Sequence, residues 1–402
     1  MSHPGLDAHT IDAARAVTPG IDHVVHLNHA GSSLPSESVL EAQIAHLRLE
    51  AEIGGYEAAG AAADADAAVY DSIAELLGAR AHEISRHEHA TAAWNAGFWS
   101  IPMEAGQRIV TARAAYGANA VAFLRAAERR GVTVEVCPDD EHGQVDVSAL
   151  EATLGDDVAL VALTHVPTNG GLVNPAAEVG RLARAADVPF LLDACQSAGQ
   201  VALDVDQLGC DLLSATGRKY LRGPRGTGFL YASDRIIDRL TPDHPDHHGA
   251  DWSAHDQYDL ADGARRFEHW EYNHAAWLGL GVAVREAISI GIPGIESTVA
   301  ATAEDFRARL DDAGFRVRDL GRVRCGIVTI DCVDPKGRPF DGDRVKTALR
   351  AEAINVSLSS PSSTRFDAEA RGLGRLMRLS AHYLTTDDEL DRAVDALRRA
   401  TA

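Results

Sequence analysis

Short apolar runs alternate with amphipathic segments along the chain from about residue 70 onward. The runs are rich in Val, Ile and Leu, and they have the length of buried strands rather than of helices. Strands of this kind, separated by helical patterns, predict an α/β fold with a largely parallel sheet covered on both faces. Ligands of such sheets bind beyond the carboxyl ends of the strands. The expected strands are 108–112, 132–138, 158–164, 188–193 and 227–231.

Two of the helices between these strands have recognisable starts. Ser148 and Glu151 have the spacing of a capping box, and Asn174 followed by Pro175 places a cap residue before a first-turn proline. The alanine-rich stretch 58–71, with its spaced Asp residues, is predicted to be helical rather than a linker.

After about residue 285 the pattern indicates a smaller α+β lobe. An amphipathic helix at 275–290 would join the two lobes, and Thr386 with Glu389 would open the last helix. The other expected elements of this lobe are strands at 325–330, 354–358 and 377–381 and a helix at 343–353.

The expected division of the chain has three parts. Residues 1–30 would form an N-terminal segment that packs on the small lobe, and 31–275 would form the large domain. Residues 276–402 would contain the linking helix and the small C-terminal domain.

Composition narrows the class of protein. At 402 residues the chain is long enough for two domains, and a net charge of -21 argues against binding nucleic acid or an acidic membrane surface. The five cysteines are scattered without a CxxC pair, as in a reduced cytoplasmic protein. Neither a signal peptide nor a long apolar window is visible, so no membrane span is expected.

Lys219 stands out because the chain supplies almost all of its positive charge with arginine. Lys336 and Lys346 are the other lysines among 38 basic residues. An amine can lose its proton and attack a carbonyl, which a guanidinium cannot do. Considered alone, a lysine after a strand is usually a solvated surface charge, so the interpretation depends on its neighbours.

Those neighbours describe one kind of pocket. Asp193 ends an apolar run, and its carboxylate can hold a proton on a heteroaromatic nitrogen, although a helix cap is the alternative. Gln196 can hydrogen-bond a ring hydroxyl, and Thr216 and Arg218 are suited to binding phosphate. Together with Lys219, these side chains predict a site for pyridoxal 5'-phosphate.

The segment 193–231 resembles the core of the class V aminotransferase family. These are fold type I enzymes that depend on pyridoxal 5'-phosphate, and they include cysteine desulfurases, isopenicillin N epimerase and carbon–sulfur lyases. The resemblance implies a mostly parallel large domain with a smaller α+β C-terminal lobe. Further motifs follow in the family's order: LNHAGSS (27–33), HATAAWN (89–95), HVPTNGGLVNP (165–175), RFEHWEYN (266–273) and MRLSAHYLTTDDELD (377–391).

The resemblance implies a role for each matching residue. Lys219 would form the Schiff base with the cofactor and later move protons, and Asp193 would keep the pyridine nitrogen protonated. Arg378 would bind the substrate carboxylate, with a structural ion pair as the alternative. Tyr116 would stack on the ring, with Trp94 as a rival and core packing as the alternative. The remaining expected contacts are Gln196 with Thr168 or Asn169 at the ring hydroxyl, Ala90, Thr91, Thr216 and Arg218 at the phosphate, and Asn28 at the substrate.

Three reactions on an amino-acid substrate remain open. By analogy with the ergothioneine-pathway lyases that the family resemblance suggests, elimination from a cysteine conjugate or sulfoxide by a carbon–sulfur lyase is favoured, because Lys219 can support it without a second catalytic residue. Epimerisation needs a second proton donor, for which Tyr116, His29 and His382 are candidates. Transamination needs release of a keto acid and a second substrate, and a non-catalytic binding or regulatory protein is the remaining alternative.

The sequence departs from the family at two points. No cysteine occurs in 355–380, where cysteine desulfurases carry their nucleophile, and Cys325 and Cys332 lie too early, so persulfide transfer is not expected. Glu271 stands where many relatives have a threonine that contacts the phosphate in a neighbouring subunit. A homodimer is still expected, because fold type I sites usually form between two subunits.

Three further segments contain residue types that could serve a site. The histidines of 242–252 match no zinc spacing, so we expect no metal and interpret this segment as a substrate-access loop. The GPRGTG run (223–228) lacks nucleotide-binding spacing, and its glycines would let the chain pass close to the cofactor. The hydroxyl-rich segment 359–366 is expected to line the substrate side.

Overall fold

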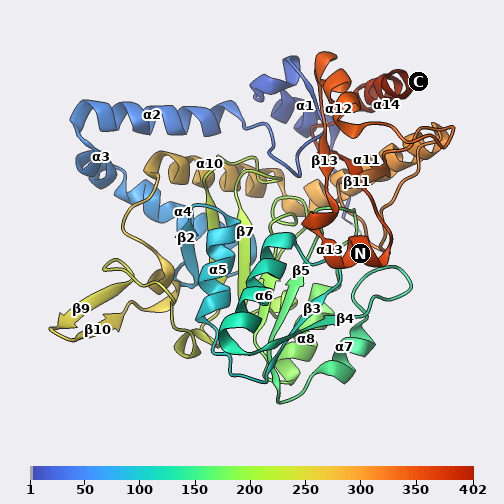
Figure 1. Cartoon of the computed structure of the whole chain (residues 1–402). Coiled ribbons are helices and arrows are strands. Elements are labelled where there is room, and N and C mark those ends of the chain that lie inside the picture. Colours follow the sequence, from blue (N-terminus) through green and yellow to red (C-terminus); the bar gives the residue numbers. More distant parts are fainter. Residues whose placement is uncertain (1–2) are drawn as a thin grey trace.

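The large sheet of the protein has seven strands in the order β2-β8-β7-β6-β5-β3-β4 (Figure 1). In this computed structural model, which describes residues 3–402, the strands from β3 to β7 are parallel to one another, and β8 runs antiparallel to both β7 and β2. The prediction of a largely parallel α/β sheet is confirmed. The strands are β2 (Ile84–His87), β3 (Arg108–Ala112), β4 (Thr133–Cys137), β5 (Val158–Thr164), β6 (Phe190–Asp193), β7 (Leu212–Thr216) and β8 (Gly228–Ala232).

All five predicted strands of this sheet are present. Those at 108–112 and 158–164 match β3 and β5 residue for residue, and the others differ at their ends by one or two residues. The apolar pattern does not predict β2 or β7, because polar side chains interrupt both of them (ISRH and LLSAT). Every residue of these two strands is nevertheless buried, so packing against neighbouring elements decides their structure.

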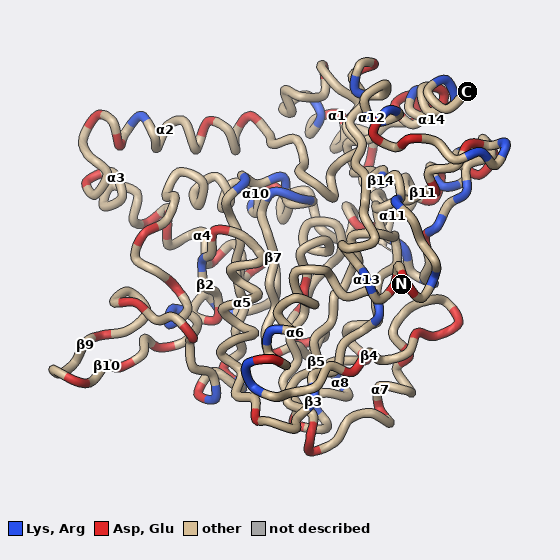
Figure 2. Tube along the Cα trace, in the orientation of Figure 1, with Lys and Arg blue, Asp and Glu red and all other residues tan. Residues whose placement is uncertain are grey.

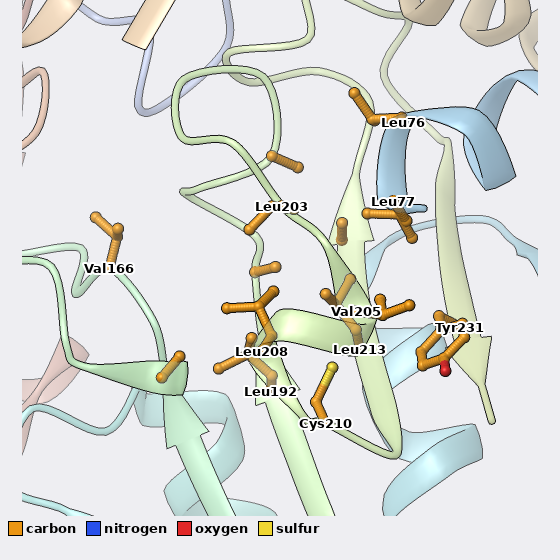
Figure 3. Close-up of a cluster of buried hydrophobic side chains, with 14 of the residues drawn as sticks. Leu76, Leu77, Val166, Leu192, Leu203, Val205, Leu208, Cys210, Leu213 and Tyr231 are labelled. Carbon is orange, nitrogen blue, oxygen red and sulfur yellow. The ribbon is translucent and has the colours of Figure 1, made fainter. Parts of the chain in front are cut away.

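Adjacent residues of β6 and β7 pack into different cores, because side chains alternate between the two faces of a sheet. Leu192 and Leu213 belong to the core shown in Figure 3, which also contains Leu76 and Leu77. Their neighbours Leu191 and Leu212 belong to the core on the other face. The first core is completed by α4 (Ala63–Leu77), α8 (Ala176–Ala185), α9 (Val205–Leu208) and α10 (His274–Ile290), and the second by α5 (Ala90–Ser100) and α6 (Gly117–Arg130).

The predicted capping box of the helix near residue 148 is wrong. Helix α7 (Val147–Thr153) starts at Asp146, whose carboxylate accepts hydrogen bonds from the backbone N–H groups of Ser148 and Ala149. A carboxylate two residues earlier therefore caps the helix instead of the Ser148 hydroxyl.

The predicted cap at Asn174 is also wrong. Helix α8 begins after Pro175, and no side chain caps it. The Asn174 amide accepts from the backbone N–H of Val145 and donates to the carbonyl of Thr164, so it ties β5 to a neighbouring loop.

The alanine-rich stretch is helical as predicted, but it breaks at Ala62 into α3 (Gly55–Ala61) and α4. Helix α2 (Glu37–Ile53) precedes them and extends with α3 away from the sheet (Figure 1). The hairpin of β9 (Ala250–Ala254) and β10 (Gln257–Leu260) projects from the same side of the molecule.

The predicted α+β lobe is present near the C-terminus, around a three-stranded sheet in the order β11-β14-β13. The N-terminal region joins this lobe through the parallel pairing of β1 with β12, while residues 1–2 of the proposed 1–30 segment lie outside the described residues. The predicted capping box of Thr386 and Glu389 is confirmed. The elements of this lobe are β1 (Val25–His26), β11 (Ile327–Asp331), β12 (Ile354–Asn355), β13 (Ser357–Ser359), β14 (Leu376–Ser380), α1 (Ala8–Ala16), α11 (Ile292–Asp312), α12 (Gly342–Ala351), α13 (Arg365–Ala370) and α14 (Asp387–Thr401).

The predicted linking helix is α10, which contacts α2 and α4 and leads into α11 through a bend of 81°. Within residues 3–402, no single helix is both long and apolar enough to cross a membrane, and only the bent pair α10–α11 passes that test jointly.

Candidate active site

A cavity of about 340 Å³ lies at the carboxyl ends of the parallel strands. This is the edge where ligands of open α/β sheets bind. Most of the site residues predicted from the sequence contribute to its wall. Those residues are Ala90, Thr91, Tyr116, Thr168, Asp193, Gln196, Thr216, Arg218 and Lys219.

Strand register places three polar side chains next to one another on the floor of this cavity. Thr164 at the end of β5 pairs with Asp193 at the end of β6, and Asp193 pairs with Ser214 on β7. Paired residues on neighbouring strands point to the same face, so the three side chains form a row. All three contribute to the cavity wall.

Asp193 is a buried carboxylate, with only 5% of its surface exposed. The side-chain amide of Asn119 donates to its Oδ2 at 2.8 Å, and the backbone N–H of Cys195 donates to Oδ1 at 3.0 Å. Burial raises the pKa of Asp193, while these two hydrogen bonds and the charge of Lys219 act in the opposite direction. Among residues 3–402 no cation lies within ion-pair distance of this carboxylate, so it can receive one from a ligand.

Lys219 lies in the turn after β7 and is 8% exposed. Burial lowers the pKa of its ammonium group, and Arg218 lowers it further, while Cys195 and Asp193 oppose the shift. A lysine with a lowered pKa gives up its proton more readily and so becomes a nucleophile. Lys346, by contrast, is exposed on α12.

Arg222 holds the turn that carries Lys219. Its backbone has φ of 62°, a conformation that is costly for a residue with a side chain. Its buried guanidinium donates to the carbonyl of Leu34 at 3.0 Å and to the hydroxyl of Tyr383 at 2.8 Å. These bonds fix the position of Lys219 relative to the N-terminal segment and the small lobe.

The start of α5 forms another part of the wall. His89 caps the helix by accepting the N–H of Ala92 at 3.0 Å. The N–H groups of Ala90 and Thr91 have no acceptor within residues 3–402. Free N–H groups at a helix N-terminus bind anions, and Arg218 contributes a positive charge to the same cavity. The Thr216 hydroxyl is already used, since it donates to the carbonyl of Thr227 at 2.9 Å.

Arg378 lies directly behind the cavity wall rather than in it. Its guanidinium donates to the hydroxyl of Thr168 at 2.6 Å and to the side-chain carbonyl of Asn28 at 3.5 Å. Burial lowers its pKa to about 10, so the group stays positive at neutral pH. It forms no ion pair with any carboxylate among the described residues, and the structural ion-pair alternative therefore has no support.

Two other predicted contacts, like Arg378, are absent from the cavity wall. Asn28 contacts Arg378 instead, and Asn169 donates to the Thr364 hydroxyl at 2.8 Å and to the Ser360 carbonyl at 3.2 Å. Gln196, which does line the cavity, donates to the carbonyl of Ala30 at 3.1 Å.

The contacts of Asn169 show where the hydroxyl-rich segment 359–366 lies. Asn169 holds it against the large domain, and Gly117 packs so closely on the Ser362 carbonyl that a Cβ there would lie 2.6 Å from it. The segment therefore adjoins Tyr116, the residue before Gly117. Arg365 points elsewhere, since it is 65% exposed and pairs with Glu369 at 3.0 Å.

Several wall residues were not predicted from the sequence. The Asn119 contact could have been found, because Asn119 follows Tyr116 by three residues and so shares its side of α6. His89 belongs to the motif HATAAWN, and Arg225 and Gly226 belong to the run 223–228 that is expected near the cofactor, but no role is predicted for these three residues individually. The remaining residues come together only in the fold, through neighbouring strands and turns. The additional wall residues are His89, Asn119, Thr164, Val166, Cys195, Ser214, Arg225 and Gly226, and Trp94 was predicted only as a rival of Tyr116.

The histidines considered as proton donors lie outside the cavity wall. His29 and His382 are buried and stacked with ring centroids 4.5 Å apart. His29 hydrogen-bonds the hydroxyl of Ser33 at 2.8 Å, and His382 hydrogen-bonds the carbonyl of Tyr220 at 3.2 Å. Burial lowers the pKa of both imidazoles, that of His382 to about 3, so both are neutral at neutral pH.

The segment 242–252, predicted to be a substrate-access loop, lies elsewhere in this chain. Pro242, Asp243 and His244 line a separate cavity of about 390 Å³ behind α5, together with Trp99 and Arg129. Among residues 3–402 no three His, Cys, Asp or Glu side chains are grouped to hold a metal ion.

Comparison with known proteins places this geometry in a family. The model of the family "Aminotransferase class-V" matches residues 24–393. A probable hercynylcysteine sulfoxide lyase of Mycobacterium tuberculosis is 30% identical over 97% of this chain and 93% of its own length. The isopenicillin N epimerase of Streptomyces clavuligerus is 26% identical over 82% of this chain and 83% of its own length.

Solved structures agree on the fold. A cysteine desulfurase of Escherichia coli superposes with a TM-score of 0.88 at 22% identity, with 97% of this chain and 98% of that chain covered. A complex of the cystine C–S lyase C-DES with cysteine persulfide gives a TM-score of 0.84 at 21% identity, with 95% of this chain and 99% of that chain covered. The chain thus belongs to the class V aminotransferase family of fold type I enzymes, which depend on pyridoxal 5'-phosphate.

Proposed function

We propose that the cavity binds pyridoxal 5'-phosphate between the free carboxylate of Asp193 and the anion-binding start of α5. The chemistry of the wall fits the group: an unpaired carboxylate for the pyridine nitrogen, an amine of lowered pKa for the aldehyde, and free N–H groups with Arg218 for the phosphate. When bound, this cofactor withdraws electrons from the carbon next to the substrate amine. Tyr116, which is 39% exposed and whose N–H donates to the hydroxyl of Thr164, is the expected stacking residue.

In this proposal Lys219 both holds the cofactor covalently and moves the substrate proton. The amine of Lys219 would remove the proton from Cα of the substrate. Arg378 binds the substrate carboxylate. Thr168 and Asn28 accept hydrogen bonds from its guanidinium and so orient it for this contact. The contact requires a small movement of Thr168, which now lies between Arg378 and the cavity.

The favoured reaction is β-elimination from a cysteine conjugate or cysteine sulfoxide. The Cα–H bond and the Cβ–S bond break, the sulfur leaves as a thiol or sulfenic acid after gaining a proton, and water releases the remainder as pyruvate and ammonia. The observation that carries this choice is that His29 and His382 lie outside the cavity wall, so Lys219 is the basic amine beside the substrate position. Similarity to a sulfoxide lyase over 97% of the chain supports the same class.

Epimerisation is the second candidate, because Tyr116 lines the same cavity as Lys219 and its phenol is a candidate for the second proton donor that this reaction needs. Burial raises the pKa of Tyr116, which keeps the phenol protonated at neutral pH. A persulfide-forming desulfurase remains disfavoured, because the segment that adjoins Tyr116, 359–366, carries serine and threonine but no cysteine.

We also propose that the enzyme acts as a homodimer. Large apolar side chains are exposed on α2, α3 and the β9–β10 hairpin, including Leu47 at 54%, Tyr56 at 79% and Trp252 at 74%. Both regions project from one side of the molecule (Figure 1), as expected for a surface that a second copy covers. Sedimentation of the wild type and of Leu47→Glu, which compares their oligomeric states, tests this proposal. We expect Leu47→Glu to weaken the dimer, and a monomeric wild type would refute the proposal.

The function is tested by adding cysteine conjugates, cysteine sulfoxides and simple amino acids to the purified enzyme while pyruvate, ammonia and keto acids are assayed. We expect pyruvate and ammonia in equal amounts from a sulfur substrate. Lys219→Ala should abolish this activity and the visible band of the bound cofactor, whereas Lys346→Ala on the surface should change neither. A keto acid that retains the substrate side chain would instead establish transamination, and inversion at Cα would establish epimerisation.

A further inference from the structure

Arg225 is a positively charged side chain in the cavity wall that has no partner. It is exposed, and it forms no hydrogen bond or ion pair with any residue from 3 to 402. The chain contains 59 acidic and 38 basic residues, and Figure 2 shows the acidic ones spread along the whole trace. An arginine in such surroundings usually finds a carboxylate, as Arg235 does with Asp211. Arg225 is therefore available for a ligand.

The backbone around Arg225 is fixed even though its side chain is free. The N–H of Gly223 donates to the carbonyl of Gly217 at 2.8 Å, and the N–H of Gly217 donates to the carbonyl of Thr227 at 3.2 Å. The turn is thus tied on both sides of Arg225 to the segment that carries Arg218 and Lys219. A guanidinium on a fixed turn can reach a ligand at little cost in backbone ordering.

Strand pairing places this turn beside the start of α5. Gly228 pairs with His87 on one side and with Thr216 on the other. A Cβ at Gly228 would lie 2.5 Å from the carbonyl carbon of His89 and 2.8 Å from the nitrogen of Ala90. The turn of Arg225 is consequently at the anion-binding end of the cavity, whereas Arg378 contacts Thr168 and Asn28.

Charge balance at that end favours a second arginine. A phosphate monoester carries about -1.5 to -2 charges at neutral pH. Arg218 contributes one positive charge, and a helix N-terminus contributes about half of one. We propose that Arg225 binds the phosphate of pyridoxal 5'-phosphate and forms, with Arg218 and the free N–H groups of Ala90 and Thr91, the phosphate site. This inference rests on the cofactor and is independent of which substrate bond the enzyme breaks.

The test compares two ligands that differ only in the phosphate. The full-length protein, freed of cofactor, is titrated with pyridoxal 5'-phosphate and with pyridoxal while the visible absorbance is recorded. Arg225→Ala should raise the dissociation constant of pyridoxal 5'-phosphate about tenfold or more and leave that of pyridoxal unchanged, because one charge-assisted contact is lost. Arg225→Lys should recover part of the affinity, and Arg181→Ala, at an exposed arginine of α8, should change neither constant.

Two other roles for Arg225 give different results. If it pairs with a carboxylate of a second copy, Arg225→Ala will weaken both ligands equally or alter the sedimentation of the protein. If it binds an anionic group of the substrate, only the KM of the substrate will rise. Either result overturns the proposal. Failure of the wild type to bind pyridoxal 5'-phosphate would instead refute the proposed cofactor site as a whole.

Discussion

The side-chain amide of Asn119 lies 2.8 Å from Oδ2 of Asp193 and is buried with it at the carboxyl edge of the sheet. An amide donor stabilises the ionised carboxylate more than the protonated acid, and it therefore lowers the pKa that burial has raised. Asn119 thus preserves the charge that the proposed pyridine contact requires.

Replacing Asn119 should accordingly move the acid limb of the activity profile. In Asn119→Ala the pKa of Asp193 rises, so activity and the visible cofactor band should be lost at a pH about one unit higher than in the wild type, since a hydrogen bond to a charged group contributes about 1.5–3 kcal/mol. The measurement is kcat/KM and absorbance across the acid range. Asn119→Asp should shift the limb further, because like charges repel, and an unchanged limb in both variants would contradict the role given to Asn119.

Arg378 should contribute to substrate binding and not to the stability of the free enzyme. It is 7% exposed without a carboxylate partner among residues 3–402, and a buried unpaired charge costs solvation energy. Arg378→Met keeps much of the volume and removes the charge. We expect KM for an amino-acid substrate to rise about 30-fold or more while the melting temperature stays the same or increases.

The matched substitution is Arg307→Met. Arg307 is equally buried but pairs with Asp319 at 2.8 Å, so its loss should lower the melting temperature instead. If Arg378→Met is destabilised as much as Arg307→Met and keeps its KM, then Arg378 is a structural residue.

The residues of the site could be predicted from the sequence where they follow apolar strands. Asp193 ends such a strand, so its place at the carboxyl edge of the sheet could be predicted. Lys219 and Arg218 follow β7, which the apolar pattern does not predict, and they are identified instead by residue type and by the resemblance to the family. Arg225 lies in the run 223–228, which is expected to pass close to the cofactor, and Cys195 lies between Asp193 and Gln196, but neither side chain has a role that its residue type predicts.

The helix caps could not be predicted from local spacing. Ser148 and Asn174 are good cap residues by type. Asp146 caps α7 in place of Ser148, and the side chain of Asn174 hydrogen-bonds the N–H of Val145 instead of capping α8. Local spacing identifies groups that are able to cap a helix, and long-range contacts select among them.

His382 should make the folded protein less stable in acid. Its pKa is lowered to about 3 by burial, with Arg222 and His26 also opposing a positive charge, and His29 stacks on the ring. An unfolded histidine titrates at about 6.5. Between these values the unfolded chain binds a proton that the folded chain does not, so the free energy of unfolding falls as pH decreases from about 6.5 toward 3.

His382→Gln removes this group and retains an N–H donor for the carbonyl of Tyr220. The slope of unfolding free energy against pH, measured by urea unfolding between about pH 5.5 and 4.5, should decrease by about 1.3 kcal/mol per pH unit. His9→Gln, at an exposed position, should leave the slope unchanged. An equal slope in His382→Gln and the wild type would mean that His382 is charged in the folded protein.

Two glycine-to-alanine substitutions in helices should have effects of opposite sign. In an exposed helix interior the change stabilises by about 0.5–1 kcal/mol, because alanine has the higher helix propensity. Gly60 is exposed in the last turn of α3, where a Cβ has no neighbour within 4 Å, so Gly60→Ala should stabilise toward the lower end of that range. Gly180 in α8 does not, since its Cβ would lie 2.0 Å from the carbonyl oxygen of Leu208, in the crossing of α8 with α9. Backbone cannot move aside as a side chain can, so overpacking outweighs propensity there, and Gly180→Ala should lower the free energy of unfolding by at least about 2 kcal/mol. Urea unfolding of both variants measures the difference, and a stabilised Gly180→Ala would show that the two helices can separate without cost.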